Sequence, residues 1–180
     1  MTDPRLVARA QLGDRRALDA LLAELQAPLH RHLAALLGDS DAADDALQEV
    51  LWTVSRKLGA LRDPRWFRAW AYRVATREGA RQARRARRLP EPTDPHDLDA
   101  VAAEEGEARF DPELVASMPA AVEALPLACR LVLRMHYLDG LTLAEVAEAL
   151  EIAPGTVRSR LAYGLTALRR RVGAELHPTR

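Results

Sequence analysis

The stretch LTLAEVAEALEIAPGTVRSRL, residues Leu141–Leu161, contains two helical patterns joined by a short turn. The first pattern has apolar residues at the spacing of one helix face: Leu143, Val146, Ala147 and Leu150. Thr142 and Glu145 have the spacing of a capping box at its start. Pro154 stands where the first turn of the second helix is expected. The stretch therefore predicts a helix-turn-helix over residues 142–161.

The second helix of this pair is expected to be apolar on one side and basic on the other. Its apolar side carries Val157, Leu161, Leu168 and Val172, with Leu165 at the edge. At about 100° per residue the opposite side carries Thr156, Ser159, Tyr163 and Arg170, and it is flanked by Arg158 and Arg160. A helix of this width fits the DNA major groove, where arginine binds guanine or phosphate. A merely solvated basic face is the weaker alternative, because the capping box, the turn and the basic flank occur together.

The composition favours helices and supplies apolar residues for one or two small cores. Ala, Leu, Arg and Glu dominate the 180 residues, and no long run of strand-forming Val, Ile and Thr appears. We therefore expect an all-α protein of two small helical domains. Cys129 is the single cysteine, so no internal disulfide can form. The sequence lacks a membrane-spanning apolar run and a signal-peptide layout at Met1–Arg5, which predicts a cytoplasmic protein.

The net charge is zero, but the charges are segregated along the chain. Residues 56–88 contain twelve Lys and Arg against two acids, and residues 89–118 contain nine acids against one arginine. Residues 154–180 contain six arginines against one glutamate. Two basic segments separated by an acidic one offer an anionic polymer two separate binding surfaces.

The apolar periodicity divides the chain into helical domains at residues 1–88 and 119–175, joined by a linker at 89–118. Within the first domain, Pro28 is expected either to kink a helix or to start a new one. Gly38 is expected to end that helical block. The linker is rich in proline and acidic residues and has few large apolar residues, so we expect no core there.

The C-terminal domain resembles that of the extracytoplasmic-function (ECF) sigma factors of bacterial RNA polymerase. The resemblance is carried by Leu125–Pro126, Arg130 and the stretch from Asp139 to Leu161. Within that stretch, Gly155–Leu161 is similar to the family's GTVKSRL-like signature. Because many regulators share a helix-turn-helix, the N-terminal domain gives the more specific evidence.

Two N-terminal stretches resemble the same family. ADDALQEVLWTVSRKL, Ala43–Leu58, is similar to its core-polymerase-binding helix, and FRAWAYRVATREGARQARRARR, Phe67–Arg88, to its promoter-melting helix. The resemblance implies a non-enzymatic sigma factor that binds core RNA polymerase and directs it to promoters. A helix-turn-helix regulator that acts without polymerase is the alternative, and a sigma-like adaptor that no longer binds DNA is a third reading.

The resemblance also implies roles for individual residues. The β′ clamp helices of the polymerase would be bound by Asp44, Asp45, Gln48, Glu49 and Leu51. The downstream (−10) element and its melting would involve Trp66, Tyr72, Arg73, Arg77, Arg81, Arg84 and Arg85. The upstream (−35) element would be read by Thr156, Arg158, Ser159, Arg160 and Tyr163. The break at 58–65 corresponds to a family loop that captures a flipped-out base. An anti-sigma factor is a further expected partner, and direct membrane insertion is not expected.

Some residues depart from the family pattern. Arg77 and Arg81 stand where the family usually has Asn and Asp, which adds positive charge facing the promoter. Tyr163 and Leu165 replace usual basic residues, so fewer phosphate contacts are expected near the −35 element. In the family the acidic linker runs toward the RNA channel of the polymerase, where it would mimic RNA. A solubilising tether is the equal alternative for this segment.

The remaining aromatic, histidine and cysteine residues point to packing rather than to catalysis. Phe67 and Trp70 align with Val74 and are expected in the core, whereas Trp66 and Tyr72 fit either the core or stacking on unpaired bases. His30 and His32 are two residues apart and point to different faces of a helix. The sequence contains neither the spacing of zinc ligands nor a Gly-rich phosphate loop, so we expect no metal and no cofactor. Cys129 is expected to be a core residue.

Overall fold

A computed structural model of the chain describes residues 2–86 and 119–176. The described residues are helical apart from short connections and contain no strand, which confirms the all-α prediction. They form two compact units. One contains residues 2–86 and 144–151, and the other contains residues 119–143 and 152–176. The linker predicted at 89–118 lies outside the described residues.

The first unit is built on four helices, α1 (Pro4–Gln11), α2 (Arg15–Leu37), α3 (Ser40–Lys57) and α4 (Phe67–Arg85). Aspartates cap the first three: Asp3 caps α1, Asp14 caps α2 and Asp39 caps α3 by accepting backbone N–H groups. Gly38, at φ 67°, ends α2 in the left-handed conformation that glycine adopts easily. The predicted stop at Gly38 is therefore confirmed. Pro28 lies inside α2 and neither ends it nor starts a new helix.

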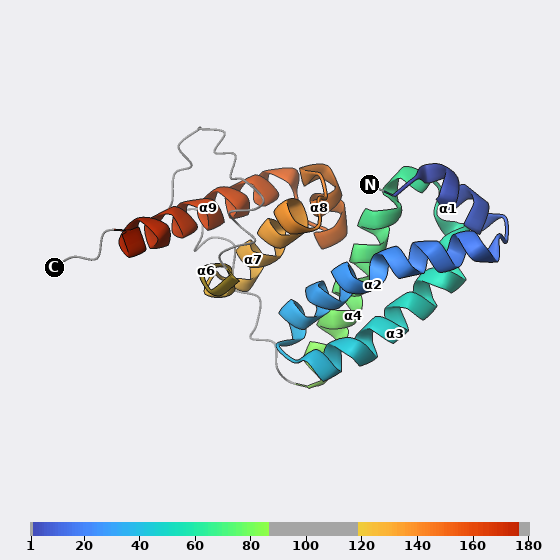
Figure 1. Cartoon of the computed structure of the whole chain (residues 1–180), viewed down its shortest axis with the longest axis horizontal. Coiled ribbons are helices and arrows are strands. Elements are labelled where there is room, and N and C mark those ends of the chain that lie inside the picture. Colours follow the sequence, from blue (N-terminus) through green and yellow to red (C-terminus); the bar gives the residue numbers. More distant parts are fainter. Residues whose placement is uncertain (1, 87–118, 177–180) are drawn as a thin grey trace. The chain divides into compact units, whose positions relative to one another are not determined.

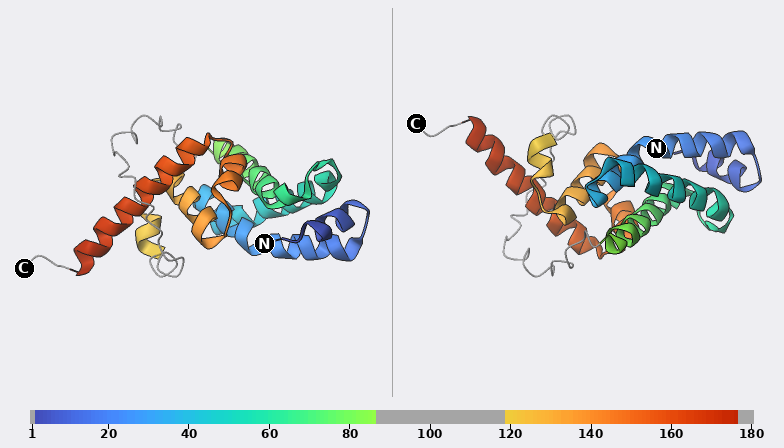
Figure 2. Two further views of the ribbon diagram at one scale, coloured as in Figure 1. Left: turned by 90° about the horizontal axis from the view of Figure 1, so that it is seen from above. Right: turned by 90° about the horizontal axis from the view of Figure 1, so that it is seen from below.

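Helices α2, α3 and α4 lie side by side and bury a common core (Figure 1, Figure 2). Its largest fully buried side chains are Leu21, Leu25, Leu29, Leu33, Val50, Phe67 and Tyr72. Gly79 lets α4 approach α2 closely, because a Cβ atom there would lie 3.0 Å from Leu36 Cδ1 and 3.2 Å from Leu33 Cδ2. Small residues on α4, including Ala71, Ala75 and Ala83, are also buried.

Two short 3₁₀ turns, η1 (Leu58–Ala60) and η2 (Pro64–Trp66), connect α3 to α4. Asp63 caps η2 by accepting the Arg65 N–H at 3.0 Å, and its carboxylate also accepts from the Arg65 guanidinium at 2.7 Å. These bonds from Arg65 hold the pKa of Asp63 below its ordinary value. Asp63 therefore ties the start of η2 to Arg65 through both its backbone and its side chain.

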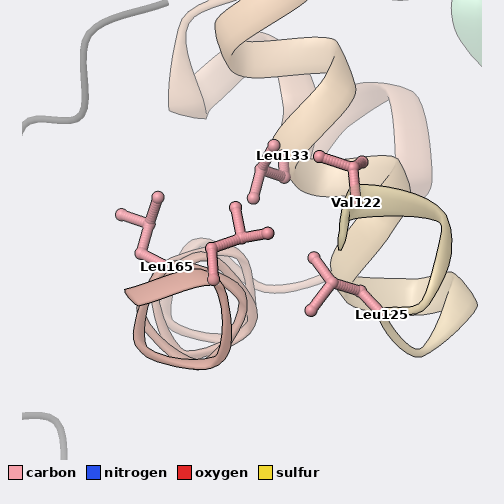
Figure 3. Packing of buried hydrophobic residues seen from close by; sticks show 5 residues of the cluster. Val122, Leu125, Leu133 and Leu165 are labelled. Carbon is pink, nitrogen blue, oxygen red and sulfur yellow. The ribbon is translucent and has the colours of Figure 1, made fainter. Parts of the chain in front are cut away.

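The second unit contains α6 (Pro119–Glu123), α7 (Leu127–Leu133), the π-helical turn η4 (Arg134–Leu138) and α9 (Pro154–Leu176). Its core cluster consists of Val122, Leu125, Leu133, Leu165 and Leu168, where side chains from α6, α7 and α9 meet (Figure 3). Leu165, predicted at the edge of the apolar side of α9, is buried in this cluster. It points inward because α9 is contacted by both α6 and α7, which widens its buried face.

Helix α8 (Leu143–Leu150) and the turn after it correspond to the predicted helix-turn-helix stretch. Val146 and Ala149 of α8 are fully buried, and Ala147 is nearly so. Glu151, the residue after α8, has a φ of 56° and therefore adopts the left-handed conformation. Three residues, Glu151 to Ala153, separate α8 from the start of α9 at Pro154, as the sequence predicted.

Candidate nucleic-acid interface

A hollow of about 390 Å³ opens where α3 is connected to α4. Its walls come from the end of α3, the loop between η1 and η2, and the first turns of α4: Lys57, Ala60, Leu61, Arg62, Asp63, Trp66, Trp70 and Arg73. Trp66 is 39% exposed, so part of this residue is open to solvent. The hollow therefore combines indole surfaces with guanidinium and ammonium groups, a combination that suits a flat, electron-rich ring attached to a phosphate chain.

The aromatic residues of this region differ in how deeply they are buried. Phe67 is buried as expected, and the half-buried Trp70 ring lies 6.4 Å from it between centroids. Tyr72, predicted among the residues that contact melted DNA, has 0% of its surface exposed and its ring packs edge-on against His32 at 5.2 Å. That placement corrects the prediction, because a fully buried ring cannot stack on a base.

The arginines of α4 extend from the hollow toward the end of the helix. Arg81 binds Glu78 one turn before it at 2.5 Å, and Arg84 and Arg85 are exposed in the last turn. Within the first unit Arg73 and Arg77 pair with the carboxylates of Glu148 and Glu151. The Arg77 pair is solvent-exposed on both sides, and exposed ion pairs contribute little to stability.

A second, smaller hollow of about 300 Å³ continues along the α3–α4 groove. It shares Lys57, Trp70 and Arg73 with the first hollow and also reaches Arg77 and Arg81. The predicted residues Arg73, Arg77 and Arg81 therefore lie along one continuous groove, whose lining has more basic than acidic residues but also includes Glu49 and Glu78. Lys57 and Arg62 also belong to this surface, although the sequence analysis gave neither a role. Their position beside the break after residue 58 was the available signal.

The outer edge of α3 carries the residues predicted to bind polymerase. Asp44, Asp45, Gln48 and Glu49 are exposed, whereas Leu51 is half-buried. The Asp44 carboxylate lies 3.2 Å from His30 Nε2. Trp52, for which no role was predicted, is 57% exposed and has the Arg56 guanidinium over its ring at 4.6 Å from the centroid. Its helical spacing from Asp45 and Gln48 places it on the same edge.

The predicted DNA-binding residues in the first turns of α9 differ in their exposure to solvent. Arg158 and Ser159 are exposed, and Thr156 and Tyr163 are half-buried. Ser159 Oγ donates to the Thr156 carbonyl oxygen at 3.1 Å, so in this conformation its hydroxyl hydrogen faces the helix. Arg160 is half-buried, with its Nε atom inaccessible to solvent. Arg158 is thus better exposed for a DNA contact than Arg160.

The described residues include no group of His, Cys, Asp and Glu side chains that could hold a metal ion. Cys129 is a buried free thiol, as expected. Burial raises its pKa, and the positive charge of Arg160 offsets part of that rise. None of the helices in the described parts of the chain is both long enough and apolar enough to cross a membrane.

Comparison with known proteins matches both halves of the chain to one family. The profile of sigma-70 region 2 matches residues 21–89, and the profile of sigma-70 region 4 matches residues 116–168. The chain belongs to the ECF sigma factors of RNA polymerase. This sigma factor is 30% identical to the RNA polymerase sigma-H factor of Pseudomonas aeruginosa, with 88% of each chain covered. It is 28% identical to the sigma-E factor of Escherichia coli K12, with 89% of each covered.

Solved structures agree with the fold of this sigma factor. CnrH in complex with the cytosolic domain of CnrY is similar with a TM-score of 0.65 and 21% identity, covering 96% of this chain and 97% of CnrH. RpoE of Bartonella quintana in complex with the anti-sigma factor NepR is similar with a TM-score of 0.61 and 21% identity, covering 86% and 95%. As a sigma factor, the protein binds core RNA polymerase and directs it to promoters to start transcription. Sigma factors are non-enzymatic initiation factors.

Proposed function

We propose that this sigma factor holds one unpaired base of the −10 element in the hollow between α3 and α4. The observation that carries this proposal is the lining: two tryptophans, one of them partly open, beside Lys57, Arg62 and Arg73. Stacking of a base on an aromatic side chain contributes about 1–3 kcal/mol and is available only after the base leaves the duplex. Binding there therefore favours the melted promoter over the closed one.

The basic groove along α4 would bind the phosphates that flank this base. Arg77, Arg81, Arg84 and Arg85 lie along or beyond the groove, and phosphate contacts release counterions and give salt-dependent affinity. The exposed pair between Arg77 and Glu151 is weak enough for phosphate to replace the carboxylate. This sequence-tolerant grip would hold the melted strand while the hollow takes its base.

Upstream, α9 would read the −35 element as duplex DNA. Its exposed start, with Arg158 and Ser159, is a convex helical surface that fits the major groove. Thr156, Tyr163 and Arg160 flank that surface and would contribute at its border. We assign the −10 function to the predicted domain 1–88 and the −35 function to the predicted domain 119–175, consistent with the residues that the two family profiles match.

The acidic edge of α3 would dock on the β′ clamp helices of core polymerase. Asp44, Asp45, Gln48 and Glu49 are exposed along it and complement a basic partner surface, with Leu51 at the border of the core. CnrH and RpoE were each solved with a partner, CnrY and the anti-sigma factor NepR. We extend this to an anti-sigma partner for the present chain, acting in the cytoplasm, with no enzymatic activity and no cofactor.

Reconstituted transcription tests this assignment. Core polymerase plus the protein, given a random promoter library, is expected to yield transcripts from a defined promoter class. Replacing Arg84 and Arg85 by Ala is expected to impair open-complex formation and to reduce the slope of log affinity against log salt by about two, because two phosphate contacts are lost. Permanganate footprints across a salt series measure both effects.

The matched control for that experiment is Arg15→Ala with Arg16→Ala, which removes two adjacent exposed arginines from the start of α2. The control is expected to keep the salt slope of the unmodified protein. Equal slopes for both double variants would contradict the phosphate-binding role of α4. DNA binding that persists without any polymerase-dependent transcript would instead favour a regulator that acts without polymerase.

A further inference from the structure

We propose that Gln11 of α1 is a positioning residue for promoter opening, because its side-chain amide holds in place the loop that lines the base-binding hollow. This inference rests on the proposed function of the hollow. The residue lies outside the stretch 21–89 that the region 2 profile matches. It was also outside every set of residues to which the sequence analysis assigned a function.

The amide nitrogen of Gln11 forms two hydrogen bonds across a sequence separation of about fifty residues. Gln11 Nε2 donates to the carbonyl oxygen of Leu61 at 2.7 Å and to that of Leu58 at 3.0 Å. A side-chain amide has two hydrogens, so both donors of this group have acceptors. The bonds are partly buried, where competition from water is reduced.

The two carbonyls bracket η1, and the chain that follows them forms the wall of the hollow. Ala60, Leu61, Arg62 and Asp63 are consecutive lining residues. Two local hydrogen bonds also order this loop: the Leu61 N–H donates to the Leu58 carbonyl oxygen, and Asp63 caps η2 by accepting the Arg65 N–H. Gln11 thus adds a tie between the loop and a different helix.

Helix α1 is a firm support for this tie. Val7 is fully buried and Ala10 nearly so, and α1 packs against α2, η1 and η2. Its C-terminal corner is fixed by Asp14, which caps α2 through the Ala17 N–H at 3.1 Å and binds Arg9 Nε at 2.9 Å. Both bonds hold the pKa of Asp14 below its ordinary value, with the Ala17 bond as the larger cause.

A loop that is already ordered binds a ligand more tightly than one that must be ordered during binding. Without the two bonds from Gln11, capture of the base would have to fix residues 59–63 as well. The expected loss is therefore specific to single-stranded −10 DNA. Binding to core polymerase and to −35 duplex DNA uses other surfaces and is expected to stay unchanged.

The test compares Gln11→Met with Gln11→Lys in reconstituted holoenzyme. Methionine has a similar length and no donor, whereas lysine retains a donor that can reach both carbonyls. The probe is a fluorescent single-stranded −10 oligonucleotide from a promoter selected by the unmodified holoenzyme. We expect Gln11→Met to weaken its binding about tenfold, the cost of about one lost polar interaction, and Gln11→Lys to restore most of it. Affinity for core polymerase and for −35 duplex is measured in parallel.

Gln26, exposed on α2, provides matched controls. Gln26→Met and Gln26→Lys make the same changes of shape and charge away from the loop, and both are expected to bind the probe like the unmodified protein. If Gln11→Met folds poorly, the milder Gln11→Asn, which is too short to reach both carbonyls, replaces it. Hydrogen exchange of residues 59–63 then reports directly on the loop and is expected to speed up.

The outcomes separate this inference from the proposed function beneath it. If Trp66→Ala weakens binding of the probe and Gln11→Met has no effect, the role of Gln11 is overturned and the function of the hollow stands. No effect of Trp66→Ala would overturn the function of the hollow itself. Equal losses of probe, duplex and core binding in Gln11→Met would show a general structural defect and would also overturn the inference.

Discussion

Helices α4 and α9 are both rich in arginine, but they present that charge on surfaces of different shape. Helix α4 packs against both α2 and α3, so its exposed strip borders a groove and ends in the hollow at Trp66. The first turns of α9 expose Arg158 and Ser159 on the side opposite the buried Val157, and Leu165 and Leu168 are buried farther along. One basic helix is therefore recessed, and the other projects.

In the proposed function, the difference in shape directs the two helices to different states of DNA. A recess with aromatic walls can enclose the ring of one unpaired base. A base that is paired and stacked inside a duplex cannot enter such a recess. A projecting helix start inserts into a groove, which only an intact duplex has. Charge alone would make the two helices equivalent, so in the proposed function the packing around each one determines which form of the promoter it binds.

Among the variants that test the contrast between α4 and α9, Trp66→Ala is expected to have the largest effect. Removing the open indole is expected to weaken binding of single-stranded −10 DNA about thirtyfold, because the stacking partner of one base is lost. Fluorescence anisotropy with reconstituted holoenzyme measures it. Trp66→Phe keeps an aromatic face and is expected to retain most of the affinity. An equal loss on −35 duplex DNA would break the division between the two helices.

The close packing that recesses α4 is tested by Gly79→Val. The added methyl groups would meet Leu36 and Leu33 at distances that require these side chains to move. We expect a loss of about 2 kcal/mol in the free energy of unfolding, measured by urea denaturation. Ala80→Val places the same β-branched residue at a less buried position and controls for helix propensity. Equal losses in the two variants would show that close approach of α4 to α2 is unimportant.

For the projecting helix, Arg158→Ala is expected to weaken −35 duplex binding about tenfold, the contribution of one good arginine contact to a base edge. Binding of single-stranded −10 DNA is expected to remain unchanged. Arg170→Ala removes the same charge about three turns farther along α9, beyond the exposed start, and serves as the control. A loss in Arg170→Ala as large as in Arg158→Ala would indicate general charge attraction rather than groove reading.

The smallest effect is expected at Gly164, the counterpart in α9 of Gly79. A Cβ atom there would lie 3.4 Å from Leu133 Cδ1 and farther from Leu125 and Cys129, so α9 is not held as closely as α4. Gly164→Ala is expected to raise the free energy of unfolding by about 0.5 kcal/mol, because alanine costs less backbone entropy in a helix. Thermal unfolding measures the change. A clear destabilisation would show that both helices need glycine for packing.

Local periodicity predicted the elements well because each helix has a clear apolar face and a clear end. Val157 and Leu168 were placed correctly on the buried side of α9, and Gly38 was identified as a helix end. The same reasoning was less decisive for two other residues: it left core packing and base stacking open for Tyr72, and it placed Leu165 only at the edge of the apolar side of α9. Both are buried because their helices are contacted from two directions, and a one-dimensional pattern does not show the second neighbour.

Parts of the candidate site could not be predicted from the sequence, because they depend on contacts between segments that are far apart in the chain. The bonds from Gln11 join residues about fifty positions apart, and no spacing rule links a glutamine to carbonyl oxygens at that separation. The lining of the hollow by Lys57 and Arg62 likewise depends on how η1 and η2 turn the chain. The chemistry of the arginine-rich segments was visible in the sequence, whereas the shape that distinguishes them appears only after folding.

The shielded thiol of Cys129 has a practical consequence for following this protein at work. Burial keeps that sulfur protonated and out of reach of maleimide reagents. A cysteine introduced at an exposed position would therefore be the one readily labelled, with no need to replace the native residue. Dye pairs attached in this way could report how far apart the two DNA-reading halves are held, in the free protein and after polymerase captures it.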